Sequence, residues 1–455
     1  MVQGWLMARI QYGTSSYERA RGDLPPLPVR NMFAEEAPTE ETQLCLQSRP
    51  ALHDRAANMG AGEIKALFRR NGVVTGALFG VAGGNLYQET VSKGAIPGSG
   101  PVSIAGNDIG IMVAAGSTLS YYNGAALASV VFPDTANVIK VFAGASRFWC
   151  IRAGTGRIYW TPPLAATVAA LAYATAESMA DELLDGLWID DTAVLFGKES
   201  VEFWPNTGDA NLPIQPLEGR VFELGIRATG CATVIGATFA WVTNDNTVCL
   251  NGQEPQPISN AGLNAKIAAS VECRLFTCLI DGRELLALRL DSECHIYGLQ
   301  SGRWSQFVTY GGNWAALCHA DGVFGAAAGK TLAWFDDHLE LGGTLERLFT
   351  AGFAINSGGV PISNLSIRTN PGNTPYLVSD YADPRVEMRI SRNGGKTWGD
   401  WKQRSLGTQG SYRDMVQWRG LGMVSQPGFL CQFRVSDPVP FRVSDVRINE
   451  KYGGR

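Results

Sequence analysis

The sequence is poor in charge and in residues suited to acid–base chemistry. Charged residues make up 18% of its 455 positions, whereas roughly 25% is usual. Only four histidines occur: His53, His295, His319 and His338. No Gly-x-Ser-x-Gly elbow accompanies them, so serine–histidine acyl transfer has no support. Carboxylate pairs such as Asp190-Asp191 leave a glycosidase open, but adjacent acids are more typical of solvated turns.

A secretory leader and a membrane-spanning run are also missing from the sequence. Arg9 interrupts the segment that would be apolar in a secretory leader. The uncharged stretch 163–176 is shorter than the roughly 20 residues that cross a bilayer. The nine cysteines are therefore expected to be reduced, buried thiols. These features predict a soluble protein made in the cytoplasm.

Glycine, by contrast, is abundant, with 53 residues, and 12 tryptophans accompany it. A weak repeat combines a strand, a small turn and a second strand that often carries aromatics. It recurs roughly every 40 residues, as propeller blades do. Its copies are residues 77–87, 111–122, 148–160, 193–204, 239–250, 276–288 and 323–335. Because a lone blade cannot bury both faces, the recurring aromatics are expected to pack between blades.

The composition changes near residue 355, after which strands alternate more clearly. Val386, Met388 and Ile390 fall on one face of a predicted half-buried strand. We therefore predict an all-β protein with three parts. Residues 1–50 form an N-terminal arm or a ring-closing segment, 51–350 form a β-propeller of about seven blades, and 356–455 form a small antiparallel β-sandwich.

Charge divides the chain unevenly. Residues 361–455 carry a net charge of +6, and the first 360 carry −10. An acidic propeller is unsuited to gripping DNA phosphates. The basic C-terminal part is either an ordinary solvated surface or a face for an acidic partner. On the partner hypothesis, reversing Arg434 and Arg442 is expected to weaken assembly without unfolding the chain.

Two apparent binding motifs fail on spacing. The segment before Gly329-Lys330-Thr331 resembles a phosphate-binding loop, but Phe324 stands at the first glycine and a strand follows. The adjacent pairs Cys294-His295 and Cys318-His319 would point to opposite faces of a strand. The sequence thus predicts no catalytic residues, no cofactor and no metal site.

One turn motif is specific. Ser391, Asn393, Gly395, Thr397 and Trp398 fit the Asp-box pattern S-x-[DN]-x-G-x-T-W. Hydroxyl and amide side chains can close a tight hairpin turn. We interpret this box as structural, although it is common in sialidases.

A second motif resembles one known family. Phe196, Gly197, Glu202, Trp204, Asn206, Thr207 and Gly208 fit the pattern F-G-x-x-[ST]-x-E-x-W-x-N-T-G of the packaged-DNA stabilisation proteins of short-tailed bacteriophages (podoviruses). Asp181 and Ser178 fit the family's approach to this strand. Arg49-Pro50-Ala51-Leu52 is similar to its N-terminal arm, but departs from the more usual Pro-Gly-Leu.

The resemblance implies a structural virion protein of the tail hub or nozzle, not an enzyme. Such a protein forms a homo-oligomeric ring, usually a hexamer, below the portal and its adaptor. It closes the channel over packaged DNA and guides DNA ejection. Its expected partners are the portal-adaptor protein, a tailspike or tail fibre, a tail needle or plug, and double-stranded DNA passing without sequence-specific binding. It would be assembled in the host cytoplasm into the virion tail. The alternatives are a phage receptor-binding or glycan-degrading β-propeller, and a cellular scaffold propeller.

Overall fold

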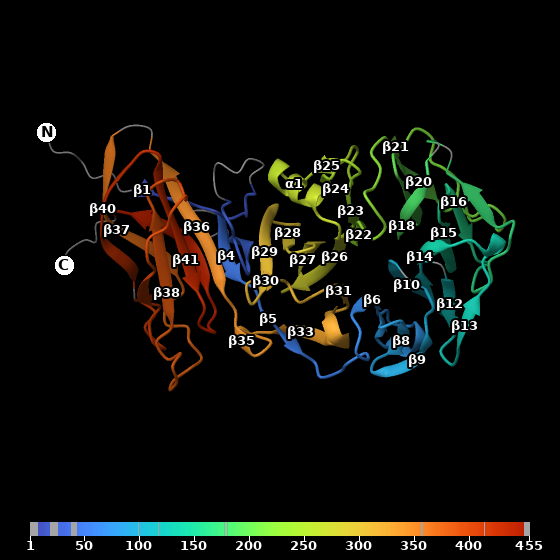
Figure 1. Ribbon diagram of the computed structural model, residues 1–455, viewed down its shortest axis with the longest axis horizontal. Coiled ribbons are helices and arrows are strands. Elements are labelled where there is room, and N and C mark those ends of the chain that lie inside the picture. Colours follow the sequence, from blue (N-terminus) through green and yellow to red (C-terminus); the bar gives the residue numbers. More distant parts are fainter. Residues whose placement is uncertain are drawn as a thin grey trace.

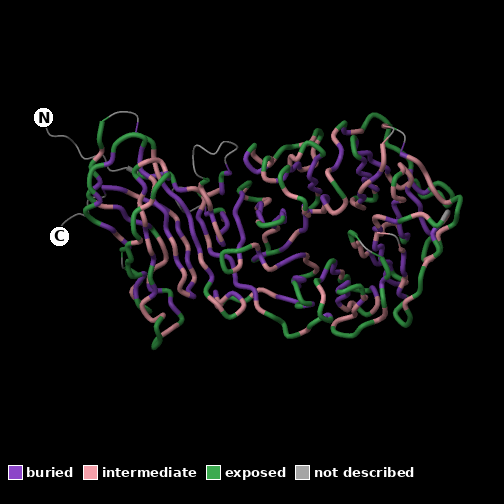
Figure 2. The backbone as a smooth tube through the Cα atoms, in the orientation of Figure 1, coloured by how far each residue is buried: buried purple, intermediate pink, exposed green. Residues whose placement is uncertain are grey.

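The structure is a computed structural model that describes residues 8–18, 26–37, 43–98, 100–116, 118–176, 178–179, 181–355, 358–413 and 415–449. It is nearly all-β, with 4% helix. A β-propeller and a β-sandwich lie side by side (Figure 1). Buried segments follow the strands of both parts, and exposed segments gather at the turns (Figure 2). Within the described residues, no helix has the length and apolar character needed to span a bilayer.

Seven sheets of the described chain form the blades of the propeller, all built from antiparallel strands, and in the first six blades these strands follow in sequence order. The first strand of each blade lines the central channel. The first four blades are β6 (Ile64–Phe68), β7 (Phe79–Ala82), β8 (Asn85–Gln88) and β9 (Val91–Ala95); β10 (Val102–Asn107), β11 (Gly110–Ala115), β12 (Thr118–Tyr122) and β13 (Leu127–Val130); β14 (Val138–Gly144), β15 (Arg147–Arg152), β16 (Arg157–Trp160) and β17 (Tyr173–Thr175); and β18 (Leu183–Ile189), β19 (Thr192–Gly197), β20 (Val201–Pro205) and β21 (Val221–Phe222).

The last blade is completed from the start of the chain. Blades 5 and 6 are β22 (Ala232–Ile235), β23 (Thr238–Val242), β24 (Val248–Leu250) and β25 (Gln256–Pro257); and β26 (Cys273–Ile280), β27 (Arg283–Leu290), β28 (Cys294–Gly298), β29 (Arg303–Thr309) and β30 (Gly312–Asn313). Blade 7 is β31 (Cys318–Ala320), β32 (Val323–Gly325), β33 (Thr331–Phe335) and β5 (Ala51–Asp54). Because β5 pairs antiparallel with β33, the two ends of the propeller close the ring.

The predicted repeat gives the correct blade count but misplaces one copy. Six copies cover the second and third strands of a blade, as in β11–β12. The copy at 276–288 instead covers β26 and β27, the first and second strands of blade 6. Its turn at Asp281-Gly282 carries the same strand–turn–strand signal as the others. The aromatics pack between blades as expected: Tyr122 of blade 2 lies 5.8 Å from Phe79 of blade 1, measured between ring centroids.

The sandwich takes strands from both ends of the chain. One sheet has the order β3 (Met32–Ala37), β4 (Gln43–Ser48), β42 (Arg442–Ile448), β37 (Gly359–Thr369) and β40 (Val416–Ser425), with β1 (Ala8–Arg9) on β42. The other has the order β2 (Gln11–Tyr12), β36 (Arg347–Ala354), β41 (Gly428–Val435), β38 (Arg385–Ser391) and β39 (Lys402–Ser405). Strands β1 to β4, between residues 8 and 48, therefore belong to the sandwich. Strand β36 begins at Arg347, so the sandwich takes over before residue 350, the end predicted for the propeller.

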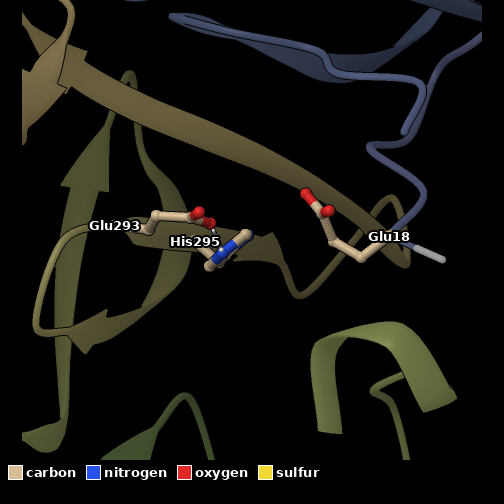
Figure 3. Close-up of side chains that lie close together, drawn as sticks. All are labelled: Glu18, Glu293 and His295. Carbon is tan, nitrogen blue, oxygen red and sulfur yellow. Dashed lines mark hydrogen bonds and ion pairs between the residues drawn. The ribbon is translucent and has the colours of Figure 1, made fainter. Parts of the chain in front are cut away.

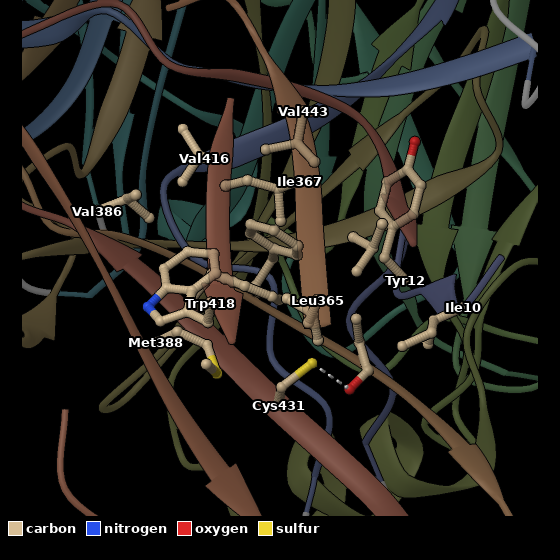
Figure 4. Packing of buried hydrophobic residues seen from close by; sticks show 14 of the residues in the cluster. Ile10, Tyr12, Leu365, Ile367, Val386, Met388, Val416, Trp418, Cys431 and Val443 are labelled. Atoms are coloured by element: carbon tan, nitrogen blue, oxygen red, sulfur yellow. Dashed lines mark hydrogen bonds between the residues drawn. The ribbon is translucent and has the colours of Figure 1, made fainter. Parts of the chain in front are cut away.

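The sandwich core lies between these two sheets (Figure 4). Val386 and Met388 are fully buried, and Ile390 packs against the core, so the predicted alternation is confirmed. The Cys431 thiol donates to the Ala351 carbonyl at 3.4 Å within the same core.

The remaining elements are short. They are η1 (Val74–Gly76), η2 (Pro133–Thr135), η3 (Ala327–Gly329), the hairpin of β34 (Leu339–Glu340) and β35 (Gly343–Thr344), and α1 (Ala261–Ala269). Helix α1 connects blades 5 and 6, and the Asn260 side chain caps it by accepting from the Leu263 N–H.

Candidate functional site

The family-like motif forms the β19–β20 hairpin of blade 4. Phe196 is fully buried and meets Phe239 and Trp241 of blade 5, at centroid distances of 5.6 and 6.2 Å. At Gly197, an added Cβ would lie 2.3 Å from the carboxylate of Asp181. Glycine is required there because this carboxylate accepts from backbone N–H groups across the hairpin turn.

The second half of the motif ties the loops of the same blade. The Trp204 indole donates to the buried Glu202 carboxylate at 2.9 Å, and the Ser178 N–H donates to the same group at 3.2 Å. Asn206 donates to Asp191 at 3.1 Å and accepts from the Gly208 N–H at 3.1 Å. The hydroxyl of Thr207, the remaining polar residue of the motif, donates to the Leu212 carbonyl at 2.6 Å. These bonds shape a hairpin and its loop.

The Asp-box-like turn joins β38 and β39. The Ser391 hydroxyl donates to Asn393 and accepts from the Gly395 N–H at 2.8 Å. Asn393 accepts from the Thr397 N–H and donates to its hydroxyl. Gly395 adopts a φ of 91°, which a side chain would strain. Trp398 is half-buried, with the Arg389 guanidinium 4.9 Å from its ring.

A buried ion pair joins the arm to the propeller. Its arginine, Arg49, lies in the segment Arg49-Pro50-Ala51-Leu52 that resembles the family's arm, but that resemblance did not predict the partner. Arg49 donates to Glu340 through both terminal nitrogens, at 2.9 and 2.8 Å, and both side chains are fully buried. Glu340 also accepts from the Leu52 N–H and the Thr309 hydroxyl, each at 2.8 Å. The Arg49 guanidinium lies 5.1 Å from the centre of the Phe307 ring. We call Arg49, Glu340, Leu52 and Thr309 the closure clamp because Leu52 belongs to the ring-closing strand β5.

Two further basic side chains, Arg347 and His338, lie buried beside the clamp. Arg347 donates to the backbone carbonyls of Val435, Asp437 and Val439. Burial lowers its pKa to about 9, which leaves it charged at neutral pH. Burial, aided by the charge of Arg347, lowers the pKa of His338 to about 4. His338 is therefore neutral at pH 7, and the charged side chains at this junction, Arg49, Glu340 and Arg347, are buried and held by hydrogen bonds.

One group of side chains resembles a metal site. Glu18, Glu293 and His295 bring their ligand atoms within 4.8 Å of one another (Figure 3). Lys266 of α1 already lies 3.0 Å from Glu18 and 2.6 Å from Glu293. Hydrogen bonds from His295 and Lys266 lower the pKa of Glu293 to about 2. Since the lysine ammonium supplies the counter-charge, this cluster acts as an ionic clasp between the arm and blades 5 and 6.

The motifs that failed on spacing are also explained by the fold. Cys294 packs in the core between blades 6 and 7, whereas His295 points to the clasp. Lys330-Thr331 leads into strand β33, so no helix N-terminus is available there for phosphate.

The inner strands of all seven blades surround a cavity of about 890 Å³. Its basic lining residues are Lys65, Arg70, Lys140 and Arg274, and its acidic ones are Glu63, Glu272 and Asp291. Lys140 is held at 2.6 Å by the buried carboxylate of Asp185. The channel lining is therefore nearly balanced in charge.

The two arginines expected to bind a partner make internal contacts instead. Arg434 pairs with Glu387 and lies 4.3 Å over the Trp401 ring. The Arg442 side chain lies 3.1 Å from the Cys45 sulfur. Reversing their charges would break these contacts, and the expectation that the fold stays intact remains a prediction. Lys402 and Arg404 on the edge strand β39 are exposed and basic.

Family models match both parts of the chain. Residues 9–314 match the β-propeller of bacteriophage P22 Gp10, and residues 346–451 match the β-sandwich of Gp10. The chain belongs to the bacteriophage P22 Gp10 family. Gp10 is a DNA-stabilisation protein, and membership makes this chain a structural protein of the phage tail and a component of the virion tail. A search of curated proteins finds no match to the sequence.

The comparison with solved structures finds similar chains at low identity. The Cps50 (Swd1) β-propeller domain of Myceliophteria thermophila is 9% identical, with a TM-score of 0.39, over 60% of this chain and 96% of that chain. PorZ of Porphyromonas gingivalis is 12% identical, with a TM-score of 0.38, over 77% and 46%. An exo-beta-1,3-galactanase of Phanerochaete chrysosporium is 9% identical, with a TM-score of 0.27, over 78% and 96%. Such values support no functional argument.

Proposed function

We propose that this protein forms the tail hub or nozzle ring of a short-tailed phage and acts without catalysis. In this role, six copies mount below the portal-adaptor, close the channel over packaged DNA, guide its ejection, and anchor tailspikes or fibres and the tail plug. The observation that carries the proposal is the match of both domains, in order, to the Gp10 family.

The contacts at the junction between the propeller and the sandwich are consistent with this role, because they couple the two domains rigidly. Residues 29–31 bridge the two parts, because Arg30 pairs with Gln306 of blade 6 and with Leu348 of the sandwich. The closure clamp lies beside this bridge, and its Arg49–Glu340 ion pair is fully buried. A hub that closes a channel over packaged DNA benefits from such rigid coupling, since a flexible linker would let the domains swing.

In this proposal, DNA passes between the copies of the protein, along the axis of the ring. A duplex does not fit inside one propeller, because its major groove alone is roughly 12 Å wide and the cavity there measures about 890 Å³. The acidic net charge of the first 360 residues would keep the ring wall from gripping phosphate.

The exposed basic edge of the sandwich is the proposed partner surface. Lys402 and Arg404 on β39 are suited to an acidic neighbour in the tail. Reversing both to glutamate is expected to reduce incorporation into particles. Because Arg404 donates to the Gln417 carbonyl at 2.9 Å, the double variant should lower the unfolding midpoint slightly, whereas Lys402→Glu alone should leave it unchanged. Arg55→Glu, an exposed reversal on the propeller, serves as the matched control. Equal incorporation of all variants would reject this surface.

The proposal is tested first by DNA retention. Phage particles are assembled with and without this protein, treated with nuclease, and the surviving genome is measured. We expect particles without it to lose their DNA. Heads that keep their DNA but fail to adsorb would instead favour a receptor-binding role, and turnover of host polysaccharide by the purified protein would favour a glycan-degrading one.

A further inference from the structure

Two cysteines meet where blades 5 and 6 pack at the channel. Cys231 directly precedes β22, and Cys273 is the first residue of β26. A backbone hydrogen bond of 2.9 Å from Leu275 to Gly230 holds these segments together. The Cys231 thiol donates to the backbone carbonyl of Cys273 at 3.1 Å, which places the Cys231 sulfur against Cys273.

Only one of the two thiols lines the channel. Cys273 is 7% exposed and contributes to the wall of the cavity of about 890 Å³, whereas Cys231 is fully buried behind it. Cys318 of blade 7 lines the same cavity and is half-buried. The channel therefore offers small reagents access to two thiols in different surroundings.

The surroundings make Cys273 the more reactive of the two channel thiols. The neighbouring Cys231 thiol, together with the nearby Arg227 charge, lowers the pKa of Cys273. The neighbouring Cys273 and burial raise the pKa of Cys231, so Cys231 remains protonated. Burial raises the pKa of Cys318 to about 12. Since the thiolate is the nucleophile, attack on a disulfide is favoured at Cys273.

We propose that Cys273 and Cys231 form a redox-active dithiol that a small disulfide, such as glutathione disulfide, oxidises to an interblade disulfide. The Cys273 thiolate attacks one sulfur of glutathione disulfide, forming a mixed disulfide and releasing one glutathione thiolate. Cys231 then gives its proton to that thiolate and attacks the Cys273 sulfur, which releases the second glutathione. The two protein thiols lose two electrons, and one glutathione disulfide is reduced to two thiols.

The second step follows from the first. The interaction with Cys273 is the largest cause of the raised pKa of Cys231, and burial is the next. Once Cys273 is held in a mixed disulfide, the largest cause is gone, which favours ionisation of Cys231. The disulfide would link the inner strands of neighbouring blades across a separation of 42 residues.

Intact mass and peptide mapping of the full chain test the proposal. The folded protein is treated with glutathione disulfide, then denatured and alkylated. We expect seven alkylated cysteines instead of the nine free ones and a cross-linked peptide pair containing Cys231 and Cys273. Cys231→Ser should stop at the mixed disulfide and carry one glutathione on Cys273. Cys318→Ser, the matched control from the same channel, should still form the disulfide.

Three results would overturn the proposal: nine alkylated cysteines after treatment, a cross-link between other cysteines, or glutathione on Cys318 ahead of Cys273. Because Cys231→Ser removes a buried side chain and can impair folding, iodoacetamide labelling of the folded wild type is followed as well. Labelling of Cys273 before Cys318 supports the proposal. The reverse order contradicts it, because access alone would then decide reactivity.

Discussion

Breaking the closure clamp should destabilise the protein far more than breaking an exposed ion pair. Glu340 accepts from Arg49, Leu52 and Thr309. Glu340→Gln leaves the fully buried Arg49 without a counter-charge, and loss of one partner of a buried pair costs about 3–5 kcal/mol. Because Leu52 lies in β5, which pairs with β33, the damage should concentrate at ring closure.

Guanidinium unfolding and hydrogen exchange measure this effect. The midpoint should fall by the equivalent of about 3–5 kcal/mol, and amides of β5 should exchange faster. The control is Asp108→Asn, which breaks a pair with Arg70 whose side chains are 69% and 51% exposed, and should cost about 0–1 kcal/mol. The double variant Arg49→Met/Glu340→Leu should be less destabilised than Glu340→Gln. Equal costs for Glu340→Gln and Asp108→Asn would refute the reasoning.

Three other perturbations follow from the geometry. Ser391→Ala removes the acceptor of the buried Gly395 N–H and should cost about 1–3 kcal/mol, measured by urea unfolding; an unchanged midpoint would show that the turn does not need its hydroxyl. Gly197→Ala places a Cβ 2.3 Å from the Asp181 carboxylate and should cost about 1–3 kcal/mol in the same assay. The pKa of His338 is lowered from 6.5 to about 4, so the unfolded chain takes up this proton at a higher pH than the folded chain does. The stability that the neutral form contributes is therefore fully present above pH 6.5 and is lost as the pH falls through 4. His338→Gln should remove up to about 3 kcal/mol of that acid dependence, and parallel stability–pH curves for the two proteins would contradict this.

The fold was largely readable from the sequence because its signals are local. Strand–turn–strand units with small turn residues recur in each blade, so counting them predicts seven. The repeat copy at 276–288 was placed on the wrong hairpin because blade 6 has two similar ones, β26–β27 and β27–β28. Pattern alone does not tell which hairpin is the equivalent one. The alternation at Val386 and Met388 was a stronger guide, since one face is fully buried.

Long-range contacts were beyond sequence reasoning. Arg49 and Glu340 are separated by 291 residues, and neither stands in a motif that suggests a partner. The family-like motif was found by its residue types, but its role required the structure, which places Ser178 and Asp181 against the β19–β20 hairpin. Likewise, Arg434 and Arg442 read as surface charges because their contacts with Glu387 and Cys45 come from distant strands.

The arm explains why such a clamp lies at the junction. β4 ends at Ser48 in the sandwich, and β5 begins at Ala51 in the propeller, so only two residues separate strands of different domains. Arg49 stands in this crossing and is fixed by Glu340 beyond the last blade. Slippage by one residue would turn every side chain of β4 and β5 to the wrong face. A buried ion pair adds little net stability over a well-packed apolar pair, so we expect its main contribution to be fixing the register in which both domains close.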